Sequence, residues 1–140
     1  MFKTVLVAID LEHGEPIQRI LQAAEDIANS NACDMHLLNV VAAAPAIVLQ
    51  FLHENYEQMA AGQAEAELAK LAAGLDLRSG TISCSIRFGT VYEEVLAAAE
   101  AVGAGLIVTG SHKSNVSDYL LGSAAARIVR HARCSVMVIR

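Results

Sequence analysis

Aromatic side chains are scarce in this chain of 140 residues, and it contains no tryptophan. Only 4% of the residues are aromatic although 54% are hydrophobic, so the core must consist mainly of Ala, Val, Leu and Ile. Such a core is typical of helices packed against a parallel sheet. A chain of this length is expected to fold as one domain, residues 1–140, and to bury roughly two-thirds of its unfolded surface.

Long apolar runs are also absent. No uninterrupted run approaches the ~20 residues that span a bilayer, so we expect no membrane insertion. The first residues, MFKTVLVAID, lead into charged residues instead of a cleavage site. We therefore expect no signal peptide and a cytoplasmic protein.

Basic residues are few and dispersed. The chain has 10 Lys and Arg against 15 Asp and Glu, a net charge of −5, and no basic block. Nucleic-acid binding needs a basic face, so nucleic acid is not an expected partner. The three cysteines (Cys33, Cys84 and Cys134) lie far apart without a CxxC pair, which predicts reduced, mostly buried thiols.

Strand-like and helix-like segments alternate along the chain. Apolar runs predict strands over residues 3–9, 34–41, 81–87, 106–109 and 134–140. Helical spacing predicts four helices: residues 17–28, residues 49–75, one capped by Thr90, and one opened by Gly122 and Ser123. This alternation predicts an α/β fold, a doubly wound five-stranded parallel sheet with helices on both faces.

Finer packing can be predicted within these segments. The strand over residues 81–87 alternates in polarity and is expected at a sheet edge. In the long helix the expected inner residues are Leu52, Tyr56, Met59, Leu68, Leu71 and Leu75. In the next helix, Thr90 and Glu93 have the spacing of a capping box, and Val91, Val95, Leu96 and Ala99 are expected to pack inward.

Ligands of doubly wound sheets bind outside the carboxyl ends of the strands, where the strand order reverses. Several familiar sites are excluded there. The turn after the first strand, IDLEHGEP, has one glycine and three acids, which does not match GxGxxG or a flavodoxin phosphate loop. The acceptor Asp and the Lys of a response regulator are missing, and GxxxxGK[ST] is absent.

The stretch GSHKSNVSDYLLGSAAARIVRH, residues 110–131, is the best candidate for binding an anion. Gly110 ends a strand, and Gly122 with Ser123 opens a helix whose first N–H groups and positive dipole end attract phosphate. Lys113 adds a positive charge between them. Taken singly, Gly110 could be a turn residue, Ser123 a helix cap and Lys113 a solvated lysine; together they favour phosphate binding.

The chain resembles the universal stress protein family over its whole length. The resemblance rests on VAID, LLNVV, IVTGSH, LLGSAA and the closing CSVMVIR. The nucleotide-binding branch of that family has Gly, two residues, Gly, nine residues, Gly, then Ser or Thr. Gly110 matches the first glycine and Gly122 with Ser123 the last pair, whereas Lys113 replaces the middle glycine and the loop is one residue shorter. The stretch is similar to the F/G-type bacterial branch, which includes ATP binders.

The resemblance implies a role for each matching residue. Ala8, Ile9 and Asp10 would line the adenine and ribose side, and Val40 with Val41 would give adenine an apolar wall. Thr109 and Gly110 would face ribose and the first phosphate. The outer phosphates would be surrounded by His112, Lys113, Gly122, Ser123 and Ala124. Asp10 could equally be a turn residue and His112 a loop residue without a partner. Family members carry Mg²⁺ or Mn²⁺ mostly on the phosphates and water.

Three classes of function remain open from the sequence. The favoured one is an ATP-binding regulator of stress response that acts through an unidentified protein partner. The second is a weak ATPase or autophosphorylating enzyme, although no nucleophile–base pair is visible in the sequence. The third is a nucleotide-free, dimeric interaction protein. The expected strand order, 3-2-1-4-5, leaves the last strand at an edge. Residues 135–139 offer apolar side chains on both faces and no proline, which predicts a homodimer through that strand.

Overall fold

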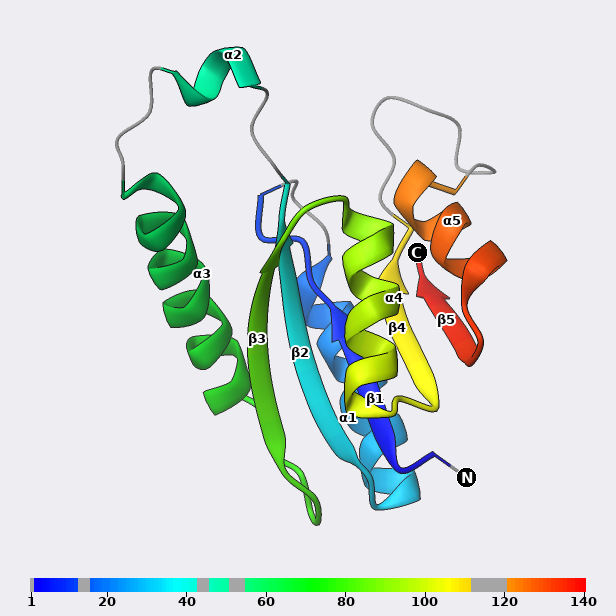
Figure 1. Cartoon of the computed structure of the whole chain (residues 1–140). Helices are drawn as coiled ribbons and strands as arrows, with labels where there is room; N and C mark the ends of the chain where they lie inside the picture. Colours follow the sequence, from blue (N-terminus) through cyan, green and yellow to red (C-terminus); the bar gives the residue numbers. More distant parts are fainter. Residues whose placement is uncertain (1, 13–15, 43–45, 51–54, 112–120) are drawn as a thin grey trace.

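Five parallel strands form one sheet in the order β3-β2-β1-β4-β5, which confirms the predicted order (Figure 1). The structure, a computed structural model, describes residues 2–12, 16–42, 46–50, 55–111 and 121–140. The strands are β1 (Thr4–Ala8), β2 (Asp34–Val41), β3 (Ile82–Phe88), β4 (Leu106–Gly110) and β5 (Ser135–Ile139). As predicted, β3 lies at one edge, and β5 lies at the other.

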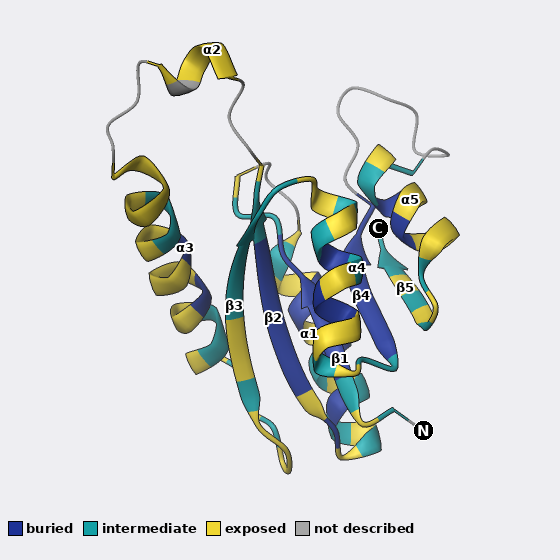
Figure 2. Ribbon diagram, viewed as in Figure 1, coloured by how far each residue is buried: buried dark blue, intermediate teal, exposed yellow. Residues whose placement is uncertain are grey.

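Helices cover both faces of the sheet, because right-handed crossovers place their helices on opposite faces once the strand order reverses. Helices α1 (Ile17–Asn31) and α3 (Tyr56–Ala73) lie on one face, and α4 (Val91–Val102) and α5 (Ser123–His131) on the other (Figure 1). Alternate strand residues therefore enter two cores: Val5, Val7 and Leu37 face α1 and α3, while Leu6 and Leu38 face α4 and α5. The central strands β1, β2 and β4 are buried on both faces (Figure 2).

The long helix predicted over residues 49–75 is shorter in the structure. A four-residue helix that was not predicted, α2 (Ala46–Leu49), precedes it, and α3 begins at Tyr56. The predicted inner residue Leu52 lies outside the described residues. Leu68 is buried as predicted, but Met59 is 60% exposed and Tyr56 is 37% exposed, so these two predictions were wrong. A cavity separates the first turns of α3 from the strand ends, so these side chains border the cavity instead of the core.

The start of α4 also differs from the prediction. Thr90 is its N-cap residue, but no side-chain cap hydrogen bond forms. The Glu93 carboxylate instead accepts a hydrogen bond from the Tyr92 hydroxyl (3.3 Å), so the capping box is absent. Val95 and Ala99 pack inward as predicted, whereas Val91 is exposed at the rim of a cavity.

The cysteine prediction was correct in part. All three cysteines are free thiols, but only Cys33 is buried, while Cys84 is exposed and Cys134 half-buried. Cys84 lies on β3, which pairs with β2 on one side and is the edge strand of the described sheet. None of the helices in the described ranges has both the length and the apolar character that a membrane crossing requires.

Candidate functional site

The strand order reverses between β1 and β4, and a cavity opens at their carboxyl ends. We call it the switch-point cavity. Its volume is about 240 Å³, and it lies between the strand ends and helices α4 and α5. The described residues that line it are Ala8, Ile9, Asp10, Glu12, Leu38, Asn39, Val40, Ala42, Val91, Val95, Thr109, Gly110, Ser123, Ala124, Ala125 and Ile128. This is the position at which a doubly wound sheet binds its ligands.

One end of the switch-point cavity is apolar with a carboxylate at its rim. Ala8, Leu38 and Val40 belong to the apolar core that β1 and β2 form with α4. Asp10 follows β1, and its Oδ1 accepts a hydrogen bond from the Glu12 N–H (2.9 Å). Asp10 therefore holds the turn after β1 and also lines the cavity, so both roles considered from the sequence agree with its position.

Asn39 supports this end of the cavity, and sequence reasoning missed it. Its Nδ2 donates a hydrogen bond to the Ile9 carbonyl (2.9 Å), and the residue is only 5% exposed. The Ile9 N–H donates to the Leu38 carbonyl (2.8 Å), so two hydrogen bonds hold the end of β1 against β2. An amide within the apolar run LLNVV is the signal that could have identified it, because buried polar side chains are normally hydrogen-bonded.

The other end of the switch-point cavity is the start of α5. Thr109, Gly110, Ser123 and Ala124 line it. The first N–H groups of a helix have no acceptor within the helix and carry a partial positive charge. The Gly122 N–H, one residue earlier, donates to the Ser111 carbonyl (3.3 Å) and so connects the helix start to the end of β4. The charged residues among the described lining are Asp10 and Glu12, both in the turn that follows β1. The two ends therefore differ in electrostatic character.

The predicted site residues fall into four groups. Eight line the switch-point cavity together: Ala8, Ile9, Asp10, Val40, Thr109, Gly110, Ser123 and Ala124. Gly122 is the N-cap of α5 beside them. Val41 lies apart, because successive strand residues point to opposite faces of a sheet, and it lines a second cavity under α3. His112 and Lys113 lie outside the described residues.

Several lining residues were not predicted. Leu38 lies two residues before Val40 on β2 and therefore faces the same side of the sheet. Ala125 and Ile128 follow Ser123 and Ala124 on α5. Extending those periodicities would have found them. Over the described ranges, no group of three or more His, Cys, Asp or Glu side chains could hold a metal ion.

The fold and this cavity define a doubly wound α/β protein with a cavity at its topological switch point. The family model of the universal stress protein family matches residues 1–140. Universal stress protein G of Escherichia coli O157:H7 is 30% identical over 143 residues, which cover 100% of both chains. The chain belongs to the universal stress protein family.

Solved structures have the same fold. UspA from Lactobacillus plantarum superposes with a TM-score of 0.74 at 23% identity, covering 99% of this chain and 97% of that one. A universal stress protein in complex with cAMP has a TM-score of 0.63 at 22% identity, covering 99% and 97%. A universal stress protein from Archaeoglobus fulgidus in complex with dAMP has a TM-score of 0.61 at 17% identity, covering 99% and 98%.

Proposed function

We propose that the switch-point cavity binds ATP and that the protein is a nucleotide-sensing regulator of the stress response, acting through a protein partner. The observation that carries the proposal is the convergence of three strand ends and a helix start on one cavity. The apolar end with Val40 and the β2 backbone suits an adenine ring, and the start of α5 suits phosphate. The cAMP and dAMP complexes of the two structural neighbours support an adenine nucleotide as the ligand class.

The cavity has room for part of the nucleotide only, so the phosphates would extend past Gly110 and Ser123 toward solvent. Lys113 and His112 would act on the outer phosphates. Mg²⁺ or Mn²⁺ would fit there as an ion carried by phosphate oxygens and water. Such an ion would screen the phosphate charge from Asp10 and Glu12.

Calorimetry with ATP and GTP on protein freed of nucleotide tests this proposal. We expect tighter binding of ATP, because the apolar wall and backbone edges at Val40 match adenine. The mass spectrum of nucleotide released from the purified protein should show an adenine nucleotide. Equal affinity for ATP and GTP, or no binding of either at millimolar concentration, would overturn it.

A pair of glycine variants tests the helix start. Gly122→Asp places a side chain and a negative charge where the phosphate is expected, so ATP binding should be abolished. Gly62→Asp is the matched control, since a side chain at Gly62 of α3 would meet nothing within 4 Å and Gly62 lines neither cavity. If Gly122→Asp folds and binds ATP like the unmodified protein, phosphate does not lie at α5.

Assays distinguish nucleotide sensing from the two other functions, an enzyme that consumes ATP and a nucleotide-free interaction protein. An ATPase would release phosphate at a rate proportional to the concentration of rigorously purified protein. An autophosphorylating enzyme would incorporate the γ-phosphate of ATP into its own chain. A nucleotide-free interaction protein would be dimeric and would bind no nucleotide. The hydrogen bond from the Gly122 N–H to the Ser111 carbonyl is the observation that favours this last function, because it occupies one donor at the helix start.

A further inference from the structure

A histidine and two serines lie together on the face of the sheet that α4 covers. His36 of β2 lies in register with Ser83 of β3, and Ser85 follows two residues later on the same face. The His36 Nδ1 lies 2.6 Å from the Ser83 Oγ, and its Nε2 lies 2.7 Å from the Ser85 Oγ. The sequence shows no nucleophile–base pair because 47 and 49 residues separate these partners, and the fold brings them together.

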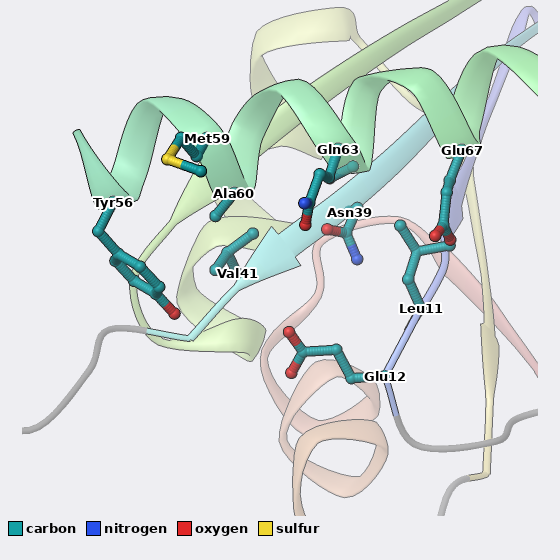
Figure 3. A pocket seen from close by; sticks show the side chains of 10 residues that line it. Leu11, Glu12, Asn39, Val41, Tyr56, Met59, Ala60, Gln63 and Glu67 are labelled. Carbon is teal, nitrogen blue, oxygen red and sulfur yellow. The ribbon is translucent and has the colours of Figure 1, made fainter. Parts of the chain in front are cut away.

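This group of three side chains lies apart from the two cavities. None of the three occurs in the described lining of the switch-point cavity or of the cavity under α3, which Figure 3 shows. His36 is only 9% exposed, whereas Ser83 is exposed and Ser85 half-buried on the edge strand. A molecule in solution can therefore reach the serine hydroxyls, and the ATP proposal uses none of these residues.

The imidazole of His36 can act as a base toward one serine while the other holds it in place. A neutral imidazole has one N–H donor and one bare nitrogen that accepts a hydrogen bond. Burial, with a smaller contribution from Arg87, lowers the pKa of His36 from 6.5, so the ring is neutral at pH 7. A serine hydroxyl that donates to such a nitrogen, with a third group orienting the ring, is the arrangement of an activated nucleophile.

The positions of the charges indicate which serine is activated. Arg87 lies two residues beyond Ser85 on the same face of β3, and its Nη1 pairs with the Glu94 carboxylate of α4 (3.0 Å). Its positive charge favours the bare nitrogen on its own side of the ring, which is Nε2. The Nε2 therefore accepts the Ser85 O–H, and the Nδ1–H donates to the Ser83 oxygen, a placement of protons that rests on charge.

A backbone N–H beside Ser85 points toward the free edge of the described sheet. The Thr81 carbonyl accepts a hydrogen bond from β2, and the Gly89 N–H donates one to β2, so the odd-numbered residues of β3 pair with that strand. Alternate residues of a parallel strand face opposite sides, so the Ile86 N–H points away from β2. The N–H of the residue after a nucleophile is one of the donors that stabilise an oxyanion in α/β-hydrolases.

We propose that Ser85 is an acyl-acceptor site that reacts with small activated carboxylic esters, with His36 as its general base. The Ser85 oxygen forms a bond to the carbonyl carbon of the ester while its proton moves to the His36 Nε2. The bond between that carbon and the leaving oxygen then breaks, and the leaving oxygen takes the proton from Nε2. The products are an O-acylserine and an alcohol. Ser83 is a positioning residue, because it acts only through the imidazole.

Acetylation by p-nitrophenyl acetate tests the proposal on nucleotide-free protein. Every variant also carries Cys84→Ala, because the exposed thiol between the two serines is itself an acyl acceptor. Peptide mass spectrometry should find an acetyl group on Ser85, and Ser85→Ala should slow acetylation of this segment at least about tenfold. Ser135→Ala is the matched control. Ser135 is an exposed serine on the opposite edge strand, in register with Leu106 instead of a histidine, and its loss should leave the rate unchanged.

Two further variants separate the base from the group that positions it. His36→Gln keeps an amide able to bond both serines but cannot take the proton, so acetylation should fall as in Ser85→Ala. Ser83→Ala should slow the reaction, and Ser83→Thr should restore it, because the threonine oxygen again accepts the Nδ1–H.

The pH dependence of the rate identifies the base. Arg87 of β3 is the charged group that acts on His36, and Glu94 of α4 pairs with it. Because the pKa of His36 is lowered, acetylation of Ser85 should be level from pH 7 to 8 and should fall as the pH drops below 6.5. Acetylation of an amine or a thiol would instead keep rising above pH 8.

Three results would overturn the proposal. They are the absence of an acetyl group on Ser85, equal rates in Ser85→Ala and Ser135→Ala, and a rate that does not fall below pH 6.5. Ser85→Ala removes a single half-buried hydroxyl, so the test does not depend on whether His36→Gln folds. Calorimetry with ATP is a separate measurement, and neither result decides the other.

Discussion

Replacing Asn39 with Leu removes the side chain that holds the end of β1 at the switch-point cavity. The substitution keeps the approximate volume but deletes the donor of the 2.9 Å bond to the Ile9 carbonyl. Ile9 is 3% exposed, so water cannot easily replace the lost donor. A buried carbonyl left unsatisfied costs about 1–3 kcal/mol, part of which the apolar Leu offsets. We expect a net loss of about 1–2 kcal/mol in the free energy of unfolding.

Such a loss is measurable by thermal or chemical denaturation. In a domain of this size, 1 kcal/mol lowers Tm by about 3–4 °C, so Asn39→Leu should melt about 3–8 °C earlier. Gln22→Leu is the matched control, because the Gln22 amide donates an exposed hydrogen bond to Asp26 on α1 (3.0 Å). That variant should stay within about 0.5 kcal/mol of the unmodified protein.

Nucleotide affinity gives a second readout of the same variant. Ile9 lines the switch-point cavity, so a β1 end released from Asn39 should bind ATP more weakly at a temperature where the variant is fully folded. The reasoning is refuted if Asn39→Leu melts within 1 °C of the unmodified protein, or if Gln22→Leu melts equally early.

Three further predictions concern pH, assembly and charge. Burial, with a smaller contribution from Arg87, lowers the pKa of His36 from its usual 6.5. The contribution of His36 to the free energy of unfolding should therefore be fully present above the ordinary pKa of 6.5 and should be lost as the pH falls toward 5. The free energy of unfolding of His36→Leu in urea should depend less on pH between 7 and 5. β5 should mediate a homodimer, so sedimentation at tens of micromolar should find a dimer, and Met137→Lys, which places a charge on this edge strand, should give a monomer. Lys113→Ala should lower ATP affinity several-fold, about 1 kcal/mol, and flatten its salt dependence, which titrations at two salt concentrations check.

Local patterns were sufficient to locate the strands and the site's main parts. β2 occupies residues 34–41 as predicted, because DMHLLNVV is a short, mainly apolar segment that follows a segment with helical spacing. The start of α5 at Ser123 follows from the glycine before it and the helical spacing after it. Since parallel strands end at one edge of the sheet, these local assignments already place Asp10, Val40 and Gly110 near one another.

Contacts between distant segments decided the rest. Asn39 and Ile9 are 30 residues apart, and no local pattern specifies their hydrogen bond. Val40 and Val41 are equally apolar in sequence, but they point to opposite faces of the sheet. Because α4 covers one face and α3 the other, Val40 lines the switch-point cavity and Val41 lines the cavity under α3. The helical spacing of Tyr56 and Met59 is that of core residues, yet both are exposed because the first turns of α3 stand off from the strand ends. Sequence periodicity states which residues share a face of a helix, whereas tertiary packing alone determines whether that face meets the core, a cavity or water.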